Sequence, residues 1–238
     1  MRFECASRTH VGLKREINED SILVETDRGL WVVADGMGGH EAGEIASAMV
    51  VDALRCLPES SDVDELASAA VEALKQVNRE LIDLARGGQG RGKTIGTTVV
   101  GLAIADGKFR CFWSGDSRAY LLRDNELTRV SHDHSLVQKL VDAGMLKEEE
   151  AETHENANLI TQAIGVADEA QVDVVDGEVR QGDCFILASD GLTRVVPDPE
   201  LASVLLAAPA PNAADRLIDV VLERGAPDNV SLIITKVI

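Results

Sequence analysis

Short apolar runs joined by tight turns are the feature that most limits how this chain can fold. Three pairs of runs are joined in this way: 21–27 with 30–35 through Arg28-Gly29, 97–106 with 108–116 at Asp106-Gly107, and the two halves of 118–131 at Asp124-Asn125. Runs joined so closely pair as antiparallel hairpins. Two more apolar runs, 184–190 and 229–238, add strands to the predicted sheets.

Longer stretches with an apolar residue at every third or fourth position predict helices. The two long ones are 41–57, with Ile45 and Val50 on its apolar face, and 63–86, and the shorter ones are 135–144, 148–152, 199–207 and 212–224. Hairpin-linked strands with a few long helices favour an α+β fold, in which helices cover antiparallel sheets. No repeat or clear linker divides the sequence, so we expect one domain over 1–238.

The chain is strongly acidic, with 23 Lys plus Arg against 41 Asp plus Glu and a formal charge of −18. Such a charge opposes binding to nucleic acids and to anionic membranes, so we expect neither as a partner. The four cysteines form no CxxC pair, the N-terminus lacks an apolar signal segment, and no apolar run reaches about 18 residues. These features predict a cytoplasmic protein.

Carboxylates recur where the apolar runs begin or end. They are Asp35, Asp116 and Asp190 at the ends of runs, and Glu19, Asp20 and Asp228 just before them. A turn explains any one of these positions, as it does Asp106-Gly107. Carboxylates that gather at one rim of a sheet, however, repel one another unless cations lie between them. Oxygen ligands suit Mg²⁺ and Mn²⁺, and two such ions activate water for hydrolysis at phosphorus.

A phosphate substrate also needs donors, and the planar fork of an arginine matches its oxygens. Arg15, four residues before Glu19, is the candidate. The same acids and Arg15 lie in six motifs whose order resembles that of the metal-dependent protein phosphatase 2C (PPM) family, in particular its small bacterial members. The motifs are RxxNED at 15–20, DGMGGHEAGE at 35–44, GTT at 96–98, GDSRAYLLR at 115–123, SDGL at 189–192 and DN at 228–229.

The resemblance implies a four-layer α-β-β-α sandwich, with two antiparallel sheets flanked by helices and a flap subdomain at about 132–165. It also implies two Mn²⁺ or Mg²⁺ ions, a third ion in bacterial members, and a hydroxide between the two ions that attacks phosphoserine or phosphothreonine in proteins directly. For the first two ions, the resemblance implies that Asp35 bridges them, that the Gly36 carbonyl binds one, and that Asp190 and Asp228 bind the other. It implies that Asp116 and Asp190 hold the third ion. It also implies that Glu19 and Asp20 bind water on the ions and that Arg15 binds the phosphoryl oxygens. The implied partners are a cognate Ser/Thr kinase and its phosphorylated targets. We expect the protein to be a monomer.

The sequence departs from the family pattern at a few positions. Met37 stands where eukaryotic members often carry a histidine proposed as a general acid, and we interpret His40 as a residue at a helix start. In the flap, Ala157 and Gln162 stand where many relatives have arginines, so substrate preferences do not carry over.

Three other interpretations stay open from the residues. The first is a pseudophosphatase that serves as a binding scaffold, which the retained acids oppose. The second is a nucleotide-binding enzyme that uses GMGGHEAGE at a helix N-terminus, although the GxxxxGK[ST] pattern is missing. The third is a zinc site at His132, Asp133 and His134.

Overall fold

The computed structural model describes residues 1–38, 42–87, 94–151 and 153–238, which form two antiparallel sheets. The β1 sheet contains, in spatial order, β1 (Phe3–His10), β11 (Val230–Val237), β10 (Cys184–Ala188), β7 (Arg118–Arg123) and β8 (Glu126–Arg129). The β3 sheet contains β2 (Asp20–Glu25), β3 (Leu30–Met37), β5 (Val99–Ala105), β6 (Lys108–Ser114) and β9 (Asp173–Glu178), with β4 (Gly96–Thr97) paired to β3.

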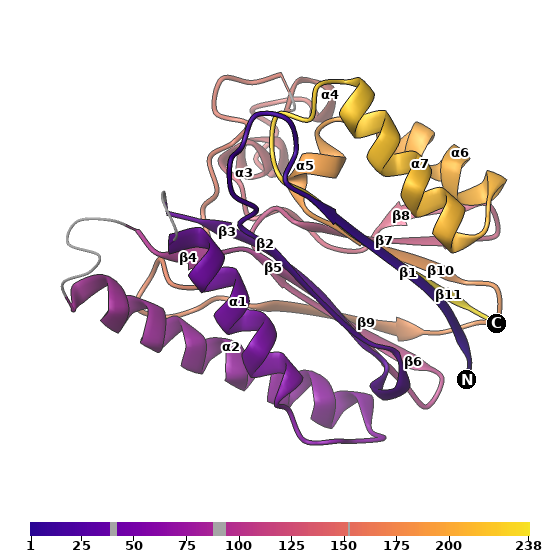
Figure 1. The fold of residues 1–238 in the computed structure, drawn as a ribbon, viewed down its shortest axis with the longest axis horizontal. Coiled ribbons are helices and arrows are strands. Elements are labelled where there is room, and N and C mark those ends of the chain that lie inside the picture. Colours follow the sequence, from indigo (N-terminus) through magenta and orange to yellow (C-terminus); the bar gives the residue numbers. More distant parts are fainter. Residues whose placement is uncertain (39–41, 88–93, 152) are drawn as a thin grey trace.

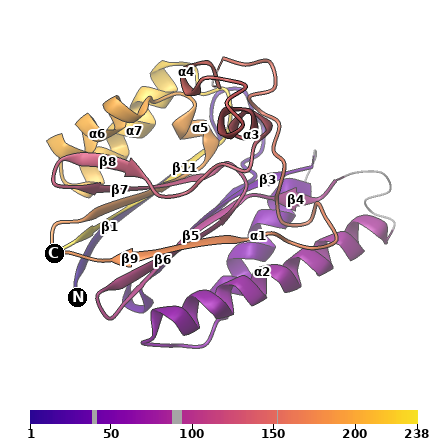
Figure 2. The same ribbon diagram turned by 180° about the vertical axis from the view of Figure 1, so that it is seen from behind.

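Helices cover the outer face of each sheet (Figure 1). On the β3 sheet lie α1 (Ala42–Arg55) and α2 (Val63–Arg86), and on the β1 sheet lie α5 (Asp190–Thr193), α6 (Asp198–Ala207) and α7 (Ala210–Glu223). Two short helices, α3 (Leu136–Asp142) and α4 (Glu148–Ala151), lie between β8 and β9 in the sequence. The layers therefore follow the order α-β-β-α, and the expected sandwich is confirmed. The rear view shows the same layers and both chain termini at one end of the sheets (Figure 2).

Each inner strand serves two cores because its neighbouring side chains point to opposite faces. In β3, Leu30 and Val32 pack under α1 and α2, whereas Trp31 and Val33 pack between the sheets. The side chains of β10 alternate in the same way: Ile186 packs under the helices of the β1 sheet, and Phe185 and Leu187 pack between the sheets. Runs that are apolar at every position are thus explained by burial on both faces.

The predicted hairpins and long helices are present. Asp106, Gly107, Asp124 and Asn125 all have positive φ, as the tight turns require. Helix α2 has the predicted bounds, and the Asp62 side chain caps it by accepting hydrogen bonds from the backbone N–H groups of residues 64 and 65.

The apolar face predicted for α1 was partly wrong, because Ile45 is 42% exposed. Small residues lie against the sheet in its place. Gly43 and Ser47 are buried, and the Ser47 hydroxyl hydrogen-bonds that of Ser21 in β2 at 2.9 Å. This close approach turns the helix so that Val50 and Leu54, rather than Ile45, enter the core. Within the described ranges, no helix is both long and apolar enough to cross a membrane.

Candidate metal centre

Strands of the β3 sheet bring acids to the end of the molecule that lies away from the termini. The register of β2 on β3 places Asp20 directly opposite Asp35. The Gly36 N–H donates to the Glu19 carbonyl oxygen at 3.1 Å, which extends this pairing past the strand end. Asp20 is 8% exposed, and Asp35 is half-buried. Two carboxylates from adjacent strands therefore share a poorly hydrated rim.

The β1 sheet adds two more acids at the same rim. Asp190 follows β10, and Asp228 precedes β11. Two hydrogen bonds join the sheets here: the Ser189 hydroxyl donates to Asp20 Oδ2 at 2.9 Å, and the Glu19 N–H donates to the Asn229 side-chain oxygen at 2.8 Å. These bonds fix residues next to Asp190 and Asp228 against the strand that carries Asp20.

Asp116 approaches from the turn between β6 and β7. Its neighbour Ser117 hydrogen-bonds the Thr98 hydroxyl at 2.7 Å, and the Thr98 N–H donates to the Asp35 carbonyl oxygen at 2.8 Å. Asp116 is 5% exposed and lies in the field of Asp190. The turn thus adds a fifth aspartate to the group.

Burial raises the pKa of four of these acids, Asp20, Asp35, Asp116 and Asp190, and the charges of neighbouring acids add to the shift. Burial, reinforced by the charges of Asp20 and Asp190, raises the pKa of Asp35 well above its ordinary value. Burial also raises the pKa of Asp116 to about 7 and that of Asp20 to about 6. For Asp190 burial raises the pKa, while Arg194 opposes the shift. Such groups either hold protons or need a cation beside them.

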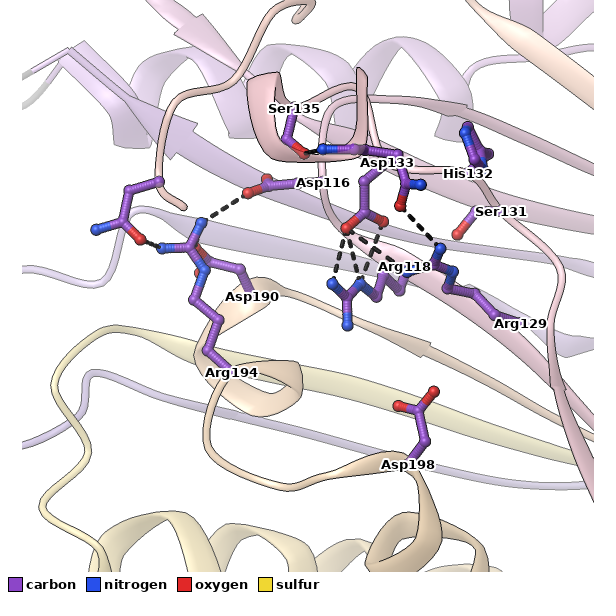
Figure 3. A network of polar contacts seen from close by, with 12 residues as sticks. Asp116, Arg118, Arg129, Ser131, His132, Asp133, Ser135, Asp190, Arg194 and Asp198 are labelled. Atoms are coloured by element: carbon purple, nitrogen blue, oxygen red, sulfur yellow. Dashed lines mark hydrogen bonds and ion pairs between the residues drawn. The ribbon is translucent and has the colours of Figure 1, made fainter. Parts of the chain in front are cut away.

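Two arginines supply part of that charge. Arg15 binds both carboxylate oxygens of Asp228, with Nη2 at 2.9 Å from Oδ2 and Nε at 2.8 Å from Oδ1. Arg194 places Nη2 at 2.8 Å from Asp116 Oδ2 and at 3.0 Å from Asp190 Oδ2. Figure 3 shows Arg194 reaching up from below the two aspartates.

The donor set fits hard divalent ions. In the described part of the chain no three His, Cys, Asp or Glu side chains are already placed around one point to hold a metal. Asp20 Oδ1 and Asp116 Oδ1 are nevertheless buried without a hydrogen-bond partner. Carboxylates, carbonyls and water are the ligands that Mg²⁺ and Mn²⁺ prefer. The residues predicted from the sequence are therefore gathered here, with arginines on three of the carboxylates.

Gly36 lies where β3 meets the start of α1. A Cβ at this position would lie 2.1 Å from the Gly43 carbonyl oxygen and 2.6 Å from that of Glu19. The Gly43 N–H in turn donates to Glu19 Oε1 at 3.2 Å. Glycine is therefore required for the close contact that holds Glu19 at the rim, and it leaves no side chain between the rim and the Gly36 backbone.

The zinc interpretation is not supported by the contacts of its three residues. Asp133 binds the guanidinium of Arg118, at 2.8 Å from Nη2 (Figure 3). His132 Nε2 lies 2.8 Å from Asp142, whereas His134 Nδ1 accepts from the Gly115 N–H at 3.2 Å. Three separate sets of partners hold the three side chains apart. His40 lies outside the described residues.

Several residues of the site were missed in the sequence. Ser189 and Asn229 lie inside the quoted motifs, but their bonds between the sheets could not be read from spacing. Arg194 carried a usable signal, because it follows Asp190 by four residues, the spacing at which an acid and a base meet on a helix.

Comparison with known proteins agrees with this geometry. A family model described as protein phosphatase 2C matches residues 9–226. The serine/threonine protein phosphatase PstP of Mycobacterium tuberculosis is 36% identical over 236 residues, which cover 98% of this chain and 45% of PstP. The chain thus spans less than half the length of that relative.

Solved structures are similar along the whole chain. PppA, described as a key regulatory component of T6SS in Pseudomonas aeruginosa, has a TM-score of 0.92 and 38% identity, and the match covers 100% of this chain and 99% of PppA. The catalytic domain of PstP in complex with two manganese ions has a TM-score of 0.86 and 36% identity, with 98% and 97% covered. The chain belongs to the protein phosphatase 2C family.

Proposed function

We propose that this protein hydrolyses phosphoserine and phosphothreonine in other proteins, with two Mn²⁺ or Mg²⁺ ions as cofactors. The observation that carries the proposal is the set of five aspartates from both sheets at one rim, where burial and mutual repulsion raise the pKa of several of them. Family membership and a relative bound to two manganese ions support it. A binding scaffold would gain nothing from such repelling acids.

Each residue of the site then has a distinct part in our proposal. Two divalent ions, when bound, neutralise the phosphoryl group and lower the pKa of water. Asp35 would hold both ions, and the others would share the remaining positions: Gly36 through its carbonyl, Asp190 and Asp228 through carboxylates, Asp116 with Asp190 at a third ion, and Glu19 and Asp20 on water.

Arg15 would bind the phosphoryl oxygens. Its side chain is 51% exposed, and its fork already binds a carboxylate, Asp228, through two nitrogen atoms. A phosphoryl group offers the same planar pair of acceptors and more negative charge. If Asp228 held an ion, the guanidinium of Arg15 would be available to the substrate. Met37 has no proton to give, so the leaving oxygen takes its proton from water.

The organisation of the protein is part of the proposal. We propose one catalytic domain over 1–238 with a flap at about 132–165, acting as a monomer in the cytoplasm. Its partners would be phosphorylated proteins, including a Ser/Thr kinase and the targets of that kinase. Ala157 and Gln162 in the flap leave it without two positive charges, so we expect weak selection for acidic residues next to the phosphoresidue.

Phosphate release from phosphoserine and phosphothreonine peptides tests the activity. The protein should release phosphate with Mn²⁺ or Mg²⁺ and stop when EDTA is added, and a phosphotyrosine peptide should react more slowly. Folded protein that binds Mn²⁺ but releases no phosphate would instead support the scaffold interpretation. Thermal stabilisation by ATP without divalent ions would favour the nucleotide-binding one.

A further inference from the structure

Arg194 is placed between two acids that could otherwise hold a cation. One nitrogen, Nη2, contacts Oδ2 of both Asp116 and Asp190, at 2.8 and 3.0 Å. The side chains of these aspartates are only 6% and 14% exposed, and that of Arg194 is 32% exposed. The guanidinium therefore supplies positive charge to a pair of acids that water reaches poorly.

The position of Arg194 is fixed from two sides. The residue ends α5, where its backbone N–H donates to the Asp190 carbonyl oxygen at 2.9 Å, so acid and base are one helical turn apart. A second nitrogen, Nη1, hydrogen-bonds the side-chain oxygen of Asn158 in the segment between α4 and β9. A cation that is tethered so close has a high effective concentration at the acids.

A guanidinium and a divalent ion cannot share these oxygens. The guanidinium already contacts Oδ2 of Asp116 and of Asp190, and a divalent ion held by the same pair would be close enough to be repelled strongly where water is scarce. A divalent ion at this pair would have to displace the guanidinium from these oxygens, and the contact with Asn158 would oppose that movement. Asp116 Oδ1, which is buried without a partner, would be the only oxygen of that carboxylate still free.

We propose that Arg194 is a built-in cation that occupies the Asp116–Asp190 pair, so that this protein binds two divalent ions tightly and a third only weakly. The inference rests on the proposed two-ion function and goes beyond it by assigning a role to a residue that the sequence motifs did not include. It also makes Arg194 a link between the acid pair and the flap, through Asn158.

Counting bound Mn²⁺ tests this role without measuring activity. Free Mn²⁺ is followed by electron paramagnetic resonance during titration of the wild type, Arg194→Gln, Arg194→Lys and Arg216→Gln. The last variant is a matched control, because Arg216 forms an exposed pair with Glu223 at 3.4 Å and its loss changes the net charge equally. Circular dichroism checks that each variant is folded.

We expect two tight sites in the wild type, in Arg194→Lys and in Arg216→Gln, and a third site in Arg194→Gln with at least tenfold higher affinity than any third site of the wild type. Adding Asp116→Asn to Arg194→Gln should remove that third site. If the wild type and Arg194→Gln bind the same number of ions with the same affinities, the role of Arg194 is overturned while the two-ion function stands. If neither binds two ions, both are overturned.

Discussion

Asp35 is the residue where burial and charge conflict most. Its carboxylate is desolvated and faces Asp20, Asp190, Asp116 and Asp228, and its pKa is raised accordingly. Each unit of such a shift corresponds to about 1.4 kcal/mol of unfavourable interaction with the ionised form. The ionised residue is therefore costly to the metal-free fold, which agrees with the role proposed for Asp35 at the ions.

Replacing Asp35 by asparagine should separate these effects. We expect Asp35→Asn to lower kcat/KM for phosphopeptides at least about 100-fold, because the negative charge proposed to hold both ions is lost. The metal-free variant should unfold at a higher temperature than the wild type at pH 8, because repulsion is relieved. Asp106→Asn, in a tight turn, is the matched control and should change neither quantity. Near-normal turnover in Asp35→Asn would contradict the two-ion site.

Arg15 gives a second prediction at this scale. Charged hydrogen bonds are worth about 1.5–3 kcal/mol, so Arg15→Ala should raise KM for phosphopeptides about 10- to 100-fold with little change in kcat. Lys14→Ala removes the neighbouring exposed charge and should leave KM nearly unchanged. Steady-state kinetics at saturating Mn²⁺ distinguish the two variants. An unchanged KM in Arg15→Ala would assign Arg15 to the surface.

At the scale of elements, the packing of α5 on β11 sets the position of Asp190. A Cβ on Gly191 would lie 1.8 Å from the Asn229 carbonyl oxygen, which belongs to the backbone and cannot turn away. Gly191→Ala should thus push α5 from the sheet, cost about 1–3 kcal/mol of stability and lower Mn²⁺ affinity at least tenfold.

Gly144→Ala is a suitable comparison for Gly191→Ala. Gly144 has a φ of +68° with open space around it, so alanine there strains only the backbone, by about 1–2 kcal/mol. Chemical denaturation and Mn²⁺ titration should show a stability loss in both variants and an affinity loss only in Gly191→Ala. Equal affinities in the two would mean that α5 does not position the ligand.

The elements found from the sequence are those with a strong local pattern. Strand β3 is apolar from Leu30 to Ala34, and α2 has a clear helical period and a cap at Asp62. Strand β1 was missed because its half-buried, mixed sequence FECASRTH becomes a strand only by pairing with β11. Strand β9, an edge strand with acids and a glycine, was missed for the same reason. Pairing between distant segments leaves little trace in either sequence.

The residues of the site likewise divide into those that the sequence predicts and those that it does not. The acids at strand ends could be listed from the sequence, because strands that stop at one rim bring their last residues together. The compensating contacts could not: Arg194 reaches Asp116 across 78 residues, and Ser189 reaches Asp20 across 169. These contacts depend on how two sheets stack, which no local pattern encodes.

For the whole molecule, the acid group and the net charge of −18 make stability depend on pH and on divalent ions. Burial raises the pKa of Asp20 to about 6 and that of Asp116 to about 7, from ordinary values of 3.8 that apply in the unfolded chain. From about pH 3.8 up to these raised values, the folded protein therefore holds more protons than the unfolded chain. Over this range the free energy of unfolding falls as pH rises. Exposed acids with a lowered pKa, such as Asp215 beside Arg8, titrate below this range.

We therefore expect the melting temperature in EDTA to fall by several degrees between pH 5 and pH 8, and the increase caused by Mn²⁺ to grow over the same range. The ions bind ionised carboxylates and displace their protons, so their stabilising effect is largest where the metal-free protein is weakest. Thermal unfolding followed by circular dichroism, with and without Mn²⁺, measures both trends. Asp116→Asn should flatten the slope in EDTA, because one titrating group is gone. A melting temperature in EDTA that rises steadily from pH 5 to pH 8 would mean that Arg15 and Arg194 already compensate the acids, and that the ions are not needed to hold this rim together.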